Sequence, residues 1–162
     1  MNNENMCTTE NEMELIFDAV SVNESLARMA VAAFVTEKNP TLEEISDVKT
    51  AVSEAVTNAI IHGYENSERY QNKDVHNNKV FLRCKWEGSI LKIEVEDKGV
   101  GISNVEQAME PLFTTKPELE RSGMGFVFMD VFMDALEVLS IPGEGCTVRM
   151  KKKIGTVSDY NG

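Results

Sequence analysis

Residues 53 to 63 read Ser53-Glu54-Ala55-Val56-Thr57-Asn58-Ala59-Ile60-Ile61-His62-Gly63, and they end a long helical pattern. The pattern begins after Pro40 with Thr41-Leu42-Glu43-Glu44, which has the spacing of a capping box. Apolar residues recur at helical spacing and form one stripe: Ile45, Val48, Val52, Ala55, Val56, Ala59 and Ile60. The sequence therefore predicts an amphipathic helix that buries this stripe and stops at Gly63, beside His62.

A second face of this predicted helix carries the polar residues Glu54 and Asn58. They are separated by one helical turn, so their side chains lie one above the other. The simplest interpretation is the solvated face of an ordinary amphipathic helix. However, the apolar residue Ile61 shares this face, and we expect that something other than water covers it.

Length and composition limit the class of protein. The chain has 162 residues, enough for one domain with a substantial core. No apolar run approaches the length of a membrane span, and the first residues lack the basic and apolar regions of a signal peptide. We therefore expect a cytoplasmic protein without membrane contact.

Charge and cysteine content limit the class of protein further. The net charge is −11, which would repel a phosphate backbone, so we expect no direct DNA binding. Any control of genes would then act through another protein. The three cysteines are scattered without paired spacing, which favours a reducing compartment and argues against a structural zinc site.

The order of predicted elements indicates the fold. Residues 1–11 are polar and predicted to be a disordered tail, 12–153 the folded domain, and 154–162 a flexible tail. Alternating apolar residues predict strands after a helical half, with a polar loop between the two halves. We expect an α+β fold, a two-layer sandwich with a mixed, mostly antiparallel sheet and helices on one face.

Two glycine-containing segments are candidates for ligand binding. Asp97-Lys98-Gly99-Val100-Gly101 places a carboxylate at a strand end, followed by two positions without side-chain bulk. Gly123-Met124-Gly125 precedes a very apolar helix, whose N-terminus would favour an anion. Each segment alone is a weak signal, because such glycines occur at many tight turns. The sequence has no Walker-type phosphate loop.

In combination, these segments resemble the nucleotide-binding boxes of the GHKL ATPase superfamily, which includes gyrase and the histidine kinases. The matching segments are Glu54 to Asn58 on a helix, Asp97-x-Gly99-x-Gly101 at a strand end, and Gly123-x-Gly125 entering a helix. The stretches Ser53–Tyr64 and Pro111–Phe126 resemble more narrowly the sporulation anti-sigma factors of spore-forming bacteria. Those proteins are serine kinases that hold a sigma factor inactive.

The resemblance implies roles for the matching residues. Glu54 would be the general base toward a serine hydroxyl, and Asn58 would offer its amide oxygen to Mg²⁺ beside ATP. Asp97 would accept a hydrogen bond from the adenine amino group. The remaining implied ATP-binding residues come from the glycine segments, a lid within residues 102–122, the start of the following helix and a late strand: Gly99, Gly101, Thr114, Thr115, Lys116, Arg121, Ser122, Gly123, Met124, Gly125, Phe126 and Thr147.

Some of these implied roles are less specific than others. Lys116 and Arg121 would lie near the terminal phosphate, although Lys116 could equally be plain surface charge. Thr147 alternates with Cys146 and Val148, so its hydroxyl would point away from their face and support the adenine end with Asp97. His62 receives no role beyond its place at the helix end.

The resemblance also implies partners, and it leaves alternatives open. The implied partners are a sigma factor of RNA polymerase, an anti-anti-sigma protein phosphorylated on serine, and a second copy in a homodimer. One alternative is a sibling switch kinase that acts on a stress-response sigma factor. Another is an anti-sigma module that only binds, although a retained Glu54 argues against it. A histidine kinase would need a phosphoaccepting hairpin, and neither His62 nor His76 lies in one.

The first predicted helix, opened by Ser21-Val22-Asn23-Glu24, suggests a partner surface. We expect its buried stripe to consist of Leu26, Met29, Ala30, Ala33 and Phe34. The opposite face would then carry Arg28, Val31 and Val35. Two apolar residues beside an arginine are typical of a protein contact, so we predict that this face binds another protein.

Overall fold

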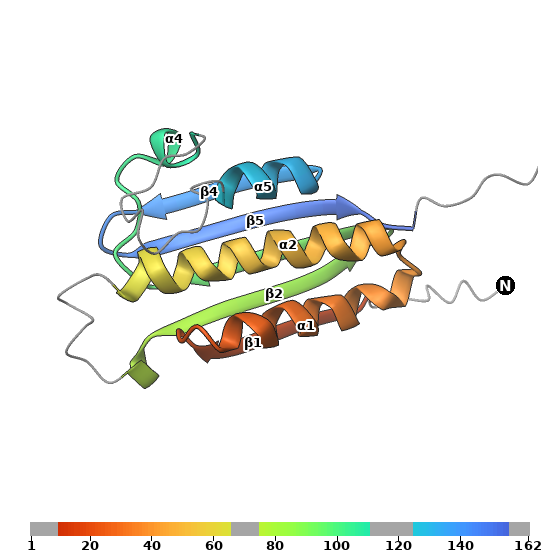
Figure 1. Cartoon of the computed structure of the whole chain (residues 1–162), viewed down its shortest axis with the longest axis horizontal. Coiled ribbons are helices and arrows are strands. Elements are labelled where there is room, and N and C mark those ends of the chain that lie inside the picture. The colour runs from red at the N-terminus through yellow and green to blue at the C-terminus, as the bar shows by residue number, and fades with distance from the viewer. Residues whose placement is uncertain (1–9, 66–74, 111–124, 156–162) are drawn as a thin grey trace, which may run out of the picture.

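The structure is a computed structural model, and it describes residues 10–65, 75–110 and 125–155. Figure 1 shows how its elements are arranged. Their bounds are β1 (Glu12–Asp18), α1 (Asn23–Val35), η1 (Thr36–Lys38), α2 (Leu42–Asn58), η2 (Ala59–Glu65), η3 (Val75–Asn77), β2 (Lys79–Glu87), β3 (Ile90–Asp97), α4 (Val105–Ala108), α5 (Gly125–Phe132), β4 (Ala135–Ile141) and β5 (Gly145–Lys153).

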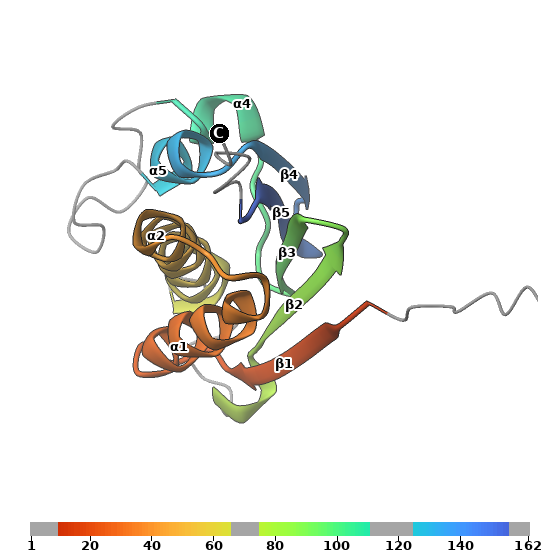
Figure 2. The ribbon, with the colours of Figure 1, turned by 90° about the vertical axis from the view of Figure 1, so that its right-hand side faces the viewer.

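The described strands form one sheet in the order β1-β2-β3-β5-β4. Every neighbouring pair is antiparallel, so the sheet is not mixed as the sequence suggested. The reason is local, because β2 and β3, and likewise β4 and β5, are joined by short turns that only antiparallel strands permit. Figure 2 shows α1, α2 and α5 together on one face of the sheet. The predicted two-layer α+β sandwich is confirmed.

The core lies between the sheet and these helices. Val80, Leu82, Cys84 and Trp86 of β2 are all buried, and their regular alternation is the kind of pattern from which the sequence predicts strands. Phe34 of α1 stacks on Trp86 with ring centroids 5.9 Å apart. The helical layer is thereby attached to the middle of the sheet.

The prediction for the faces of α1 is wrong. Val31 and Val35 are completely buried, whereas Leu26 and Met29 are 49% and 61% exposed. The buried stripe is Ala27, Val31, Phe34 and Val35, which has helical spacing just as the predicted stripe does. Both spacings suit a helix, and periodicity alone does not decide between the two faces. Val31 and Val35 therefore belong to the core and not to a partner surface.

The beginning of α1 also differs from the prediction. Val22 occupies the position before the helix, and no side chain caps it. The Glu24 carboxylate instead accepts a hydrogen bond from the Ser53 hydroxyl of α2 and lies 3.6 Å from the Arg28 guanidinium. The capping box at Thr41 and Glu44 is confirmed, with both of its reciprocal hydrogen bonds present.

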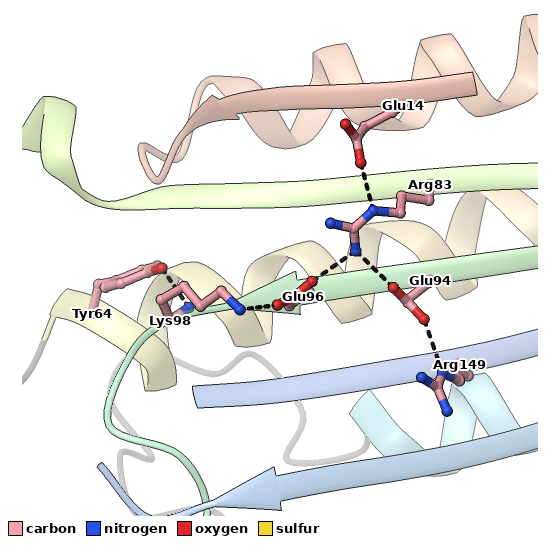
Figure 3. Close-up of polar contacts among 7 residues, drawn as sticks. All are labelled: Glu14, Tyr64, Arg83, Glu94, Glu96, Lys98 and Arg149. Carbon is pink, nitrogen blue, oxygen red and sulfur yellow. Dashed lines mark hydrogen bonds and ion pairs between the residues drawn. The ribbon is translucent and has the colours of Figure 1, made fainter. Parts of the chain in front are cut away.

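The sheet face that α1, α2 and α5 leave uncovered carries a row of ion pairs (Figure 3). Arg83 bonds to Glu14, Glu94 and Glu96, and these bonds hold the pKa of its guanidinium above its ordinary value. Glu94 is bonded in turn by Arg149, and Glu96 by Lys98. The carboxylates of β1 and β3 are thereby paired with cations from β2, from β5 and from Lys98 directly after β3.

Among the described residues, no helix combines the length and the apolar character that crossing a bilayer would require.

Candidate functional site

Helix α2 presents Glu54 and Asn58 from a firmly anchored element. Its N-terminus is fixed by the Thr41 capping box, and its opposite side buries Val48, Val52 and Val56 completely. Glu54 and Asn58 are only partly exposed. Because the helix cannot rotate without exposing its core stripe, the two polar side chains have a fixed direction.

The N-terminus of α5 lies against this pair. A Cβ atom on Gly125 would lie 3.1 Å from Asn58 Nδ2 and 3.2 Å from Glu54 Oε2. Gly125 is itself buried, and any larger residue would push into these two side chains. The structure therefore brings together a carboxylate, an amide and the first turn of a helix, where backbone N–H groups favour an anion. Their roles toward a nucleotide stay predictions.

Asp97 ends β3 inside the protein, with a side chain only 5% exposed. Its Oδ1 accepts a hydrogen bond of 2.9 Å from the Gly99 N–H, and the Cys146 N–H also donates to the carboxylate. Burial nevertheless raises the pKa of Asp97 to about 6, because loss of water outweighs these two bonds. A buried carboxylate at a strand end is suited to accept a hydrogen bond from a ligand.

Gly63 does not end the helix as predicted. The chain continues from α2 into a wider π-helical turn, η2, which extends to Glu65. The Gly63 carbonyl accepts a 3.0 Å bond from Val100 N–H, and a Cβ atom on Gly63 would lie 3.0 Å from Asp97 Cγ. Gly63 is thus needed for the close approach of the helix end to Asp97. Such π-helical turns are rare in proteins, and they occur frequently at functional sites.

Gly99 and Gly101 are explained by contacts within the protein. A Cβ atom on Gly99 would lie 2.1 Å from the Gly63 carbonyl oxygen, which excludes any other residue. Gly101 has a φ of +72°, and its Cβ would lie 2.5 Å from the Ile141 carbonyl oxygen at the end of β4. The 97–101 loop is therefore held between η2 and the β4–β5 turn. Approach of a nucleotide to these glycines stays a prediction.

The predicted cooperation of Thr147 with Asp97 is wrong. In the pairing of β3 with β5, Asp97 lies opposite Cys146, and Thr147 lies opposite Glu96. Directly paired residues share a face of the sheet, so Thr147 lies on the face away from Asp97. The alternation within β5 was predicted correctly, but the register between β5 and β3 could not be deduced from it.

Most of the implied lid lies outside the described residues. This concerns Thr114, Thr115, Lys116, Arg121, Ser122, Gly123 and Met124, whose roles stay predictions. Phe126 is described, and it packs partly buried against the core. His62 lies within η2 and is partly buried.

Two residues that sequence reasoning gave no role take part in the site. Tyr64 is buried in η2 and bonds to Lys98 N–H directly after Asp97. Cys146 bonds to the Asp97 carboxylate through its N–H. Tyr64 directly follows the predicted helix, and a buried tyrosine usually finds a hydrogen-bond partner for its hydroxyl group. Its position could therefore have indicated this contact. No sequence signal marks Cys146, because its role depends on strand register.

Comparison with known proteins gives a family for this arrangement. The model of the histidine kinase-like ATPase domain matches residues 18–152, which include Glu54, Asn58, Asp97 and Gly125. In structure, the chain is similar to the RsbU and RsbW domains of a Mycobacterium tuberculosis protein. The TM-score is 0.63 at 16% identity, over 89% of this chain and 32% of that one. It is also similar to the catalytic domain of the histidine kinase ThkA, with a TM-score of 0.52 at 12% identity, over 88% and 96% of the two chains.

Curated relatives give a narrower family. The chain is 55% identical to the anti-sigma F factor of Clostridium acetobutylicum and 53% identical to that of Clostridium beijerinckii, in both cases over 93% of this chain and 99% of the relative. It is 48% identical to the anti-sigma F factor of Oceanobacillus iheyensis, over 90% and 94% of the two chains. Since the domain model and nearly full-length relatives agree, the chain belongs to the anti-sigma F factors, a family with the histidine kinase-like ATPase domain.

Proposed function

We propose that this protein is an anti-sigma factor that binds ATP and phosphorylates an anti-anti-sigma protein on serine. The observation that carries the proposal is the contact of Gly125 with Glu54 and Asn58, because it joins a potential base to a potential phosphate-binding helix N-terminus. Membership of the anti-sigma F family supports the partners, and the domain family supports ATP. We place this activity in the cytoplasm, where a sigma factor meets RNA polymerase.

Glu54 is the proposed general base. Its carboxylate would take the proton from the serine hydroxyl of the partner while that oxygen bonds to the γ-phosphorus of ATP. The bond between the γ-phosphorus and the bridging oxygen then breaks, and ADP leaves with both electrons of that bond. A module that only binds the sigma factor would not need a carboxylate at this position.

Asn58 fits a magnesium ion by its chemistry. Mg²⁺ prefers oxygen ligands and is commonly held by few protein groups together with phosphates and water. The Asn58 amide lies next to Gly125 at the first turn of α5, where phosphates would bind. Magnesium would neutralise charge on the phosphates and orient them. No cluster of three or more His, Cys, Asp or Glu residues is found in the part of the chain that the structure describes.

Asp97 is the proposed acceptor for the adenine amino group. Its buried carboxylate is held by Gly99 N–H and Cys146 N–H, and guanine would present an oxygen where adenine presents a donor. The site would therefore select ATP over GTP, because an unpaired buried polar group costs roughly 1–3 kcal/mol.

Arg28 is the proposed contact for protein partners. Its side chain is 38% exposed, and its Nε atom is buried without a hydrogen-bond partner among the described residues. An acidic group of a sigma factor or of its antagonist could supply an acceptor to this guanidinium. Phosphorylation of the antagonist would then oppose rebinding by added charge and bulk. A homodimer is also part of this proposal.

The test is phosphoryl transfer in solution. The protein would be incubated with γ-labelled ATP, Mg²⁺ and candidate anti-anti-sigma proteins, and the products examined for phosphoserine. A variant of the candidate with alanine at its acceptor serine is the matched control. Label on serine of the unchanged candidate alone would support the proposal. If ATP binds and a sigma factor is held but no candidate gains label, the binding-only alternative replaces it.

A further inference from the structure

Tyr64 makes two partly buried hydrogen bonds next to the proposed adenine site. Its side chain is 3% exposed, and its hydroxyl donates to the Lys79 carbonyl oxygen at 2.7 Å. The same oxygen accepts the Lys98 N–H at 2.7 Å (Figure 3). One phenol group thus joins η2, the first residue of β2 and the residue that follows Asp97.

The bond to Lys98 is one of three in succession. The N–H groups of Lys98, Gly99 and Val100 donate to Tyr64 Oη, Asp97 Oδ1 and the Gly63 carbonyl, respectively. Two of these three acceptors belong to η2. The backbone that follows Asp97 is therefore set by the end of the helix that carries Glu54 and Asn58.

The chemistry of these bonds requires a hydroxyl group. Lys98 N–H needs an acceptor and the Lys79 carbonyl needs a donor, and a tyrosine hydroxyl supplies both. Phenylalanine would fill the same space but leave both backbone groups without this partner. Backbone groups that lose a hydrogen-bond partner in a partly buried place are costly, so we expect the loop to move until they regain partners.

We propose that Tyr64 is a positioning residue for the nucleotide base, because its hydroxyl fixes the Lys98 backbone and so directs the Asp97 carboxylate. This inference rests on the proposed function, in which Asp97 receives the adenine amino group. The Tyr64 hydroxyl bonds to Lys79 and Lys98, beside Asp97, so we expect it to act on base binding and not on phosphoryl transfer.

The experiment compares Tyr64→Phe with the parent chain at full length. Calorimetry with ADP and GDP should show roughly tenfold weaker ADP binding, from the loss of about one hydrogen bond, and a smaller preference over GDP. The KM for ATP should rise while kcat at saturating ATP stays unchanged. Amide hydrogen exchange in the nucleotide-free protein should become faster at Lys98.

Thr41→Ala is the matched control. It removes the capping bond at the far end of α2, which costs about 1 kcal/mol of stability without touching the loop. Its ADP affinity should equal that of the parent. Gly63→Ala is a second probe, since a Cβ 3.0 Å from Asp97 Cγ should displace the same carboxylate and weaken ADP binding if Tyr64→Phe fails to fold.

Three outcomes decide the matter. If a folded Tyr64→Phe protein keeps both the ADP affinity and the preference over GDP, the positioning role is wrong. An equal loss of affinity in Thr41→Ala would also overturn it, since general destabilisation would then explain both. If the parent binds neither ADP nor ATP, the proposed function fails, and that result is distinct from a failure of the Tyr64 inference.

Discussion

Asp97 lies directly opposite Cys146 in the pairing of β3 with β5, and the Cys146 N–H donates to its carboxylate. The next position, Gly145, has a φ of +118°, and a Cβ there would lie 2.1 Å from the Asp97 carbonyl oxygen. The Asp97 side chain is thus held by β5, by its own loop through Gly99 and by Gly63 of η2. Because the position of this carboxylate is fixed, we expect nucleotide binding to depend on its protonation state.

ADP affinity should fall as the pH is lowered through about 6. Burial raises the pKa of Asp97 to about 6, and only the ionised carboxylate is a full acceptor for the adenine amino group. Below that pH, each further unit should weaken binding by up to about tenfold, since a proton must leave first. Calorimetry across about pH 5 to 8 measures this. Asp97→Asn should bind weakly and lack the dependence, and an unchanged profile in that variant would contradict the assignment.

Asp97 should also make the nucleotide-free protein less stable at neutral pH. Its folded-state pKa of about 6 exceeds the ordinary value of 3.8, so protonation favours the folded state. That contribution is complete below about pH 4 and is lost as the pH rises through about 6. Asp97→Asn should therefore gain stability relative to the parent as the pH rises from about 4. The gain should reach on the order of 3 kcal/mol at neutral pH. Denaturant unfolding measures the difference in free energy of unfolding between the two proteins. A difference that does not vary over this pH range would contradict the raised pKa of Asp97.

Glu54→Gln should abolish serine phosphorylation while ATP still binds. The base acts on the attacking hydroxyl and not on the nucleotide, and loss of a general base typically costs about 10²–10⁴ in rate. Asn58→Ala should instead weaken binding that depends on Mg²⁺. Single-turnover transfer and calorimetry separate the two effects. Transfer at the parent's rate by Glu54→Gln would mean that another group is the base.

Val31→Ala should destabilise the fold, and Met29→Ala should not. Val31 is completely buried between α1 and its neighbours, whereas Met29 is 61% exposed. Removal of buried methyl groups leaves a cavity and costs roughly 1–3 kcal/mol, while exposed substitutions usually stay within about 0.5 kcal/mol. Thermal unfolding of both variants is sufficient. The reverse order of stability would restore the face of α1 that the sequence suggested.

Arg28→Glu should weaken binding of the sigma factor or of its antagonist without changing ADP affinity. The exposed guanidinium would lose its pairing with an acidic partner group, and reversal of a hot-spot charge costs roughly 2 kcal/mol or more. Because Arg28 also lies beside Glu24, Arg28→Gln serves as a variant without the added like charge. Calorimetry with each partner measures the affinities. Unchanged binding of both partners would mean that Arg28 does not contact them.

The sequence was informative where periodicity is unambiguous. The faces of β2, the capping box at Thr41 and the placement of Glu54 with Asn58 follow from local patterns, and the two-layer fold follows from element order. The prediction from sequence failed where two arrangements fit the same pattern of residues equally well. Both stripes of α1 have helical spacing, and only the tertiary packing of the helix shows that the face with Val31 is the buried one. The positions of Thr147 and Tyr64 depend on register and on a π turn, which are properties of the assembled sheet and helix.

Because η2 continues α2 without a break, the number of residues in this segment sets how Glu54 and Asn58 lie relative to Gly63 and Tyr64. Glu54 and Asn58 lie near one end of the proposed nucleotide, and Gly63 and Tyr64 fix the loop at its other end. A residue inserted or deleted between Asn58 and Gly63 would turn these groups by about 100° relative to one another and shift them by about 1.5 Å. We therefore expect this segment to tolerate changes of side chain better than an insertion or a deletion. In the proposed function, this continuous segment would set the distance between the groups that bind the phosphates and the groups that bind the base.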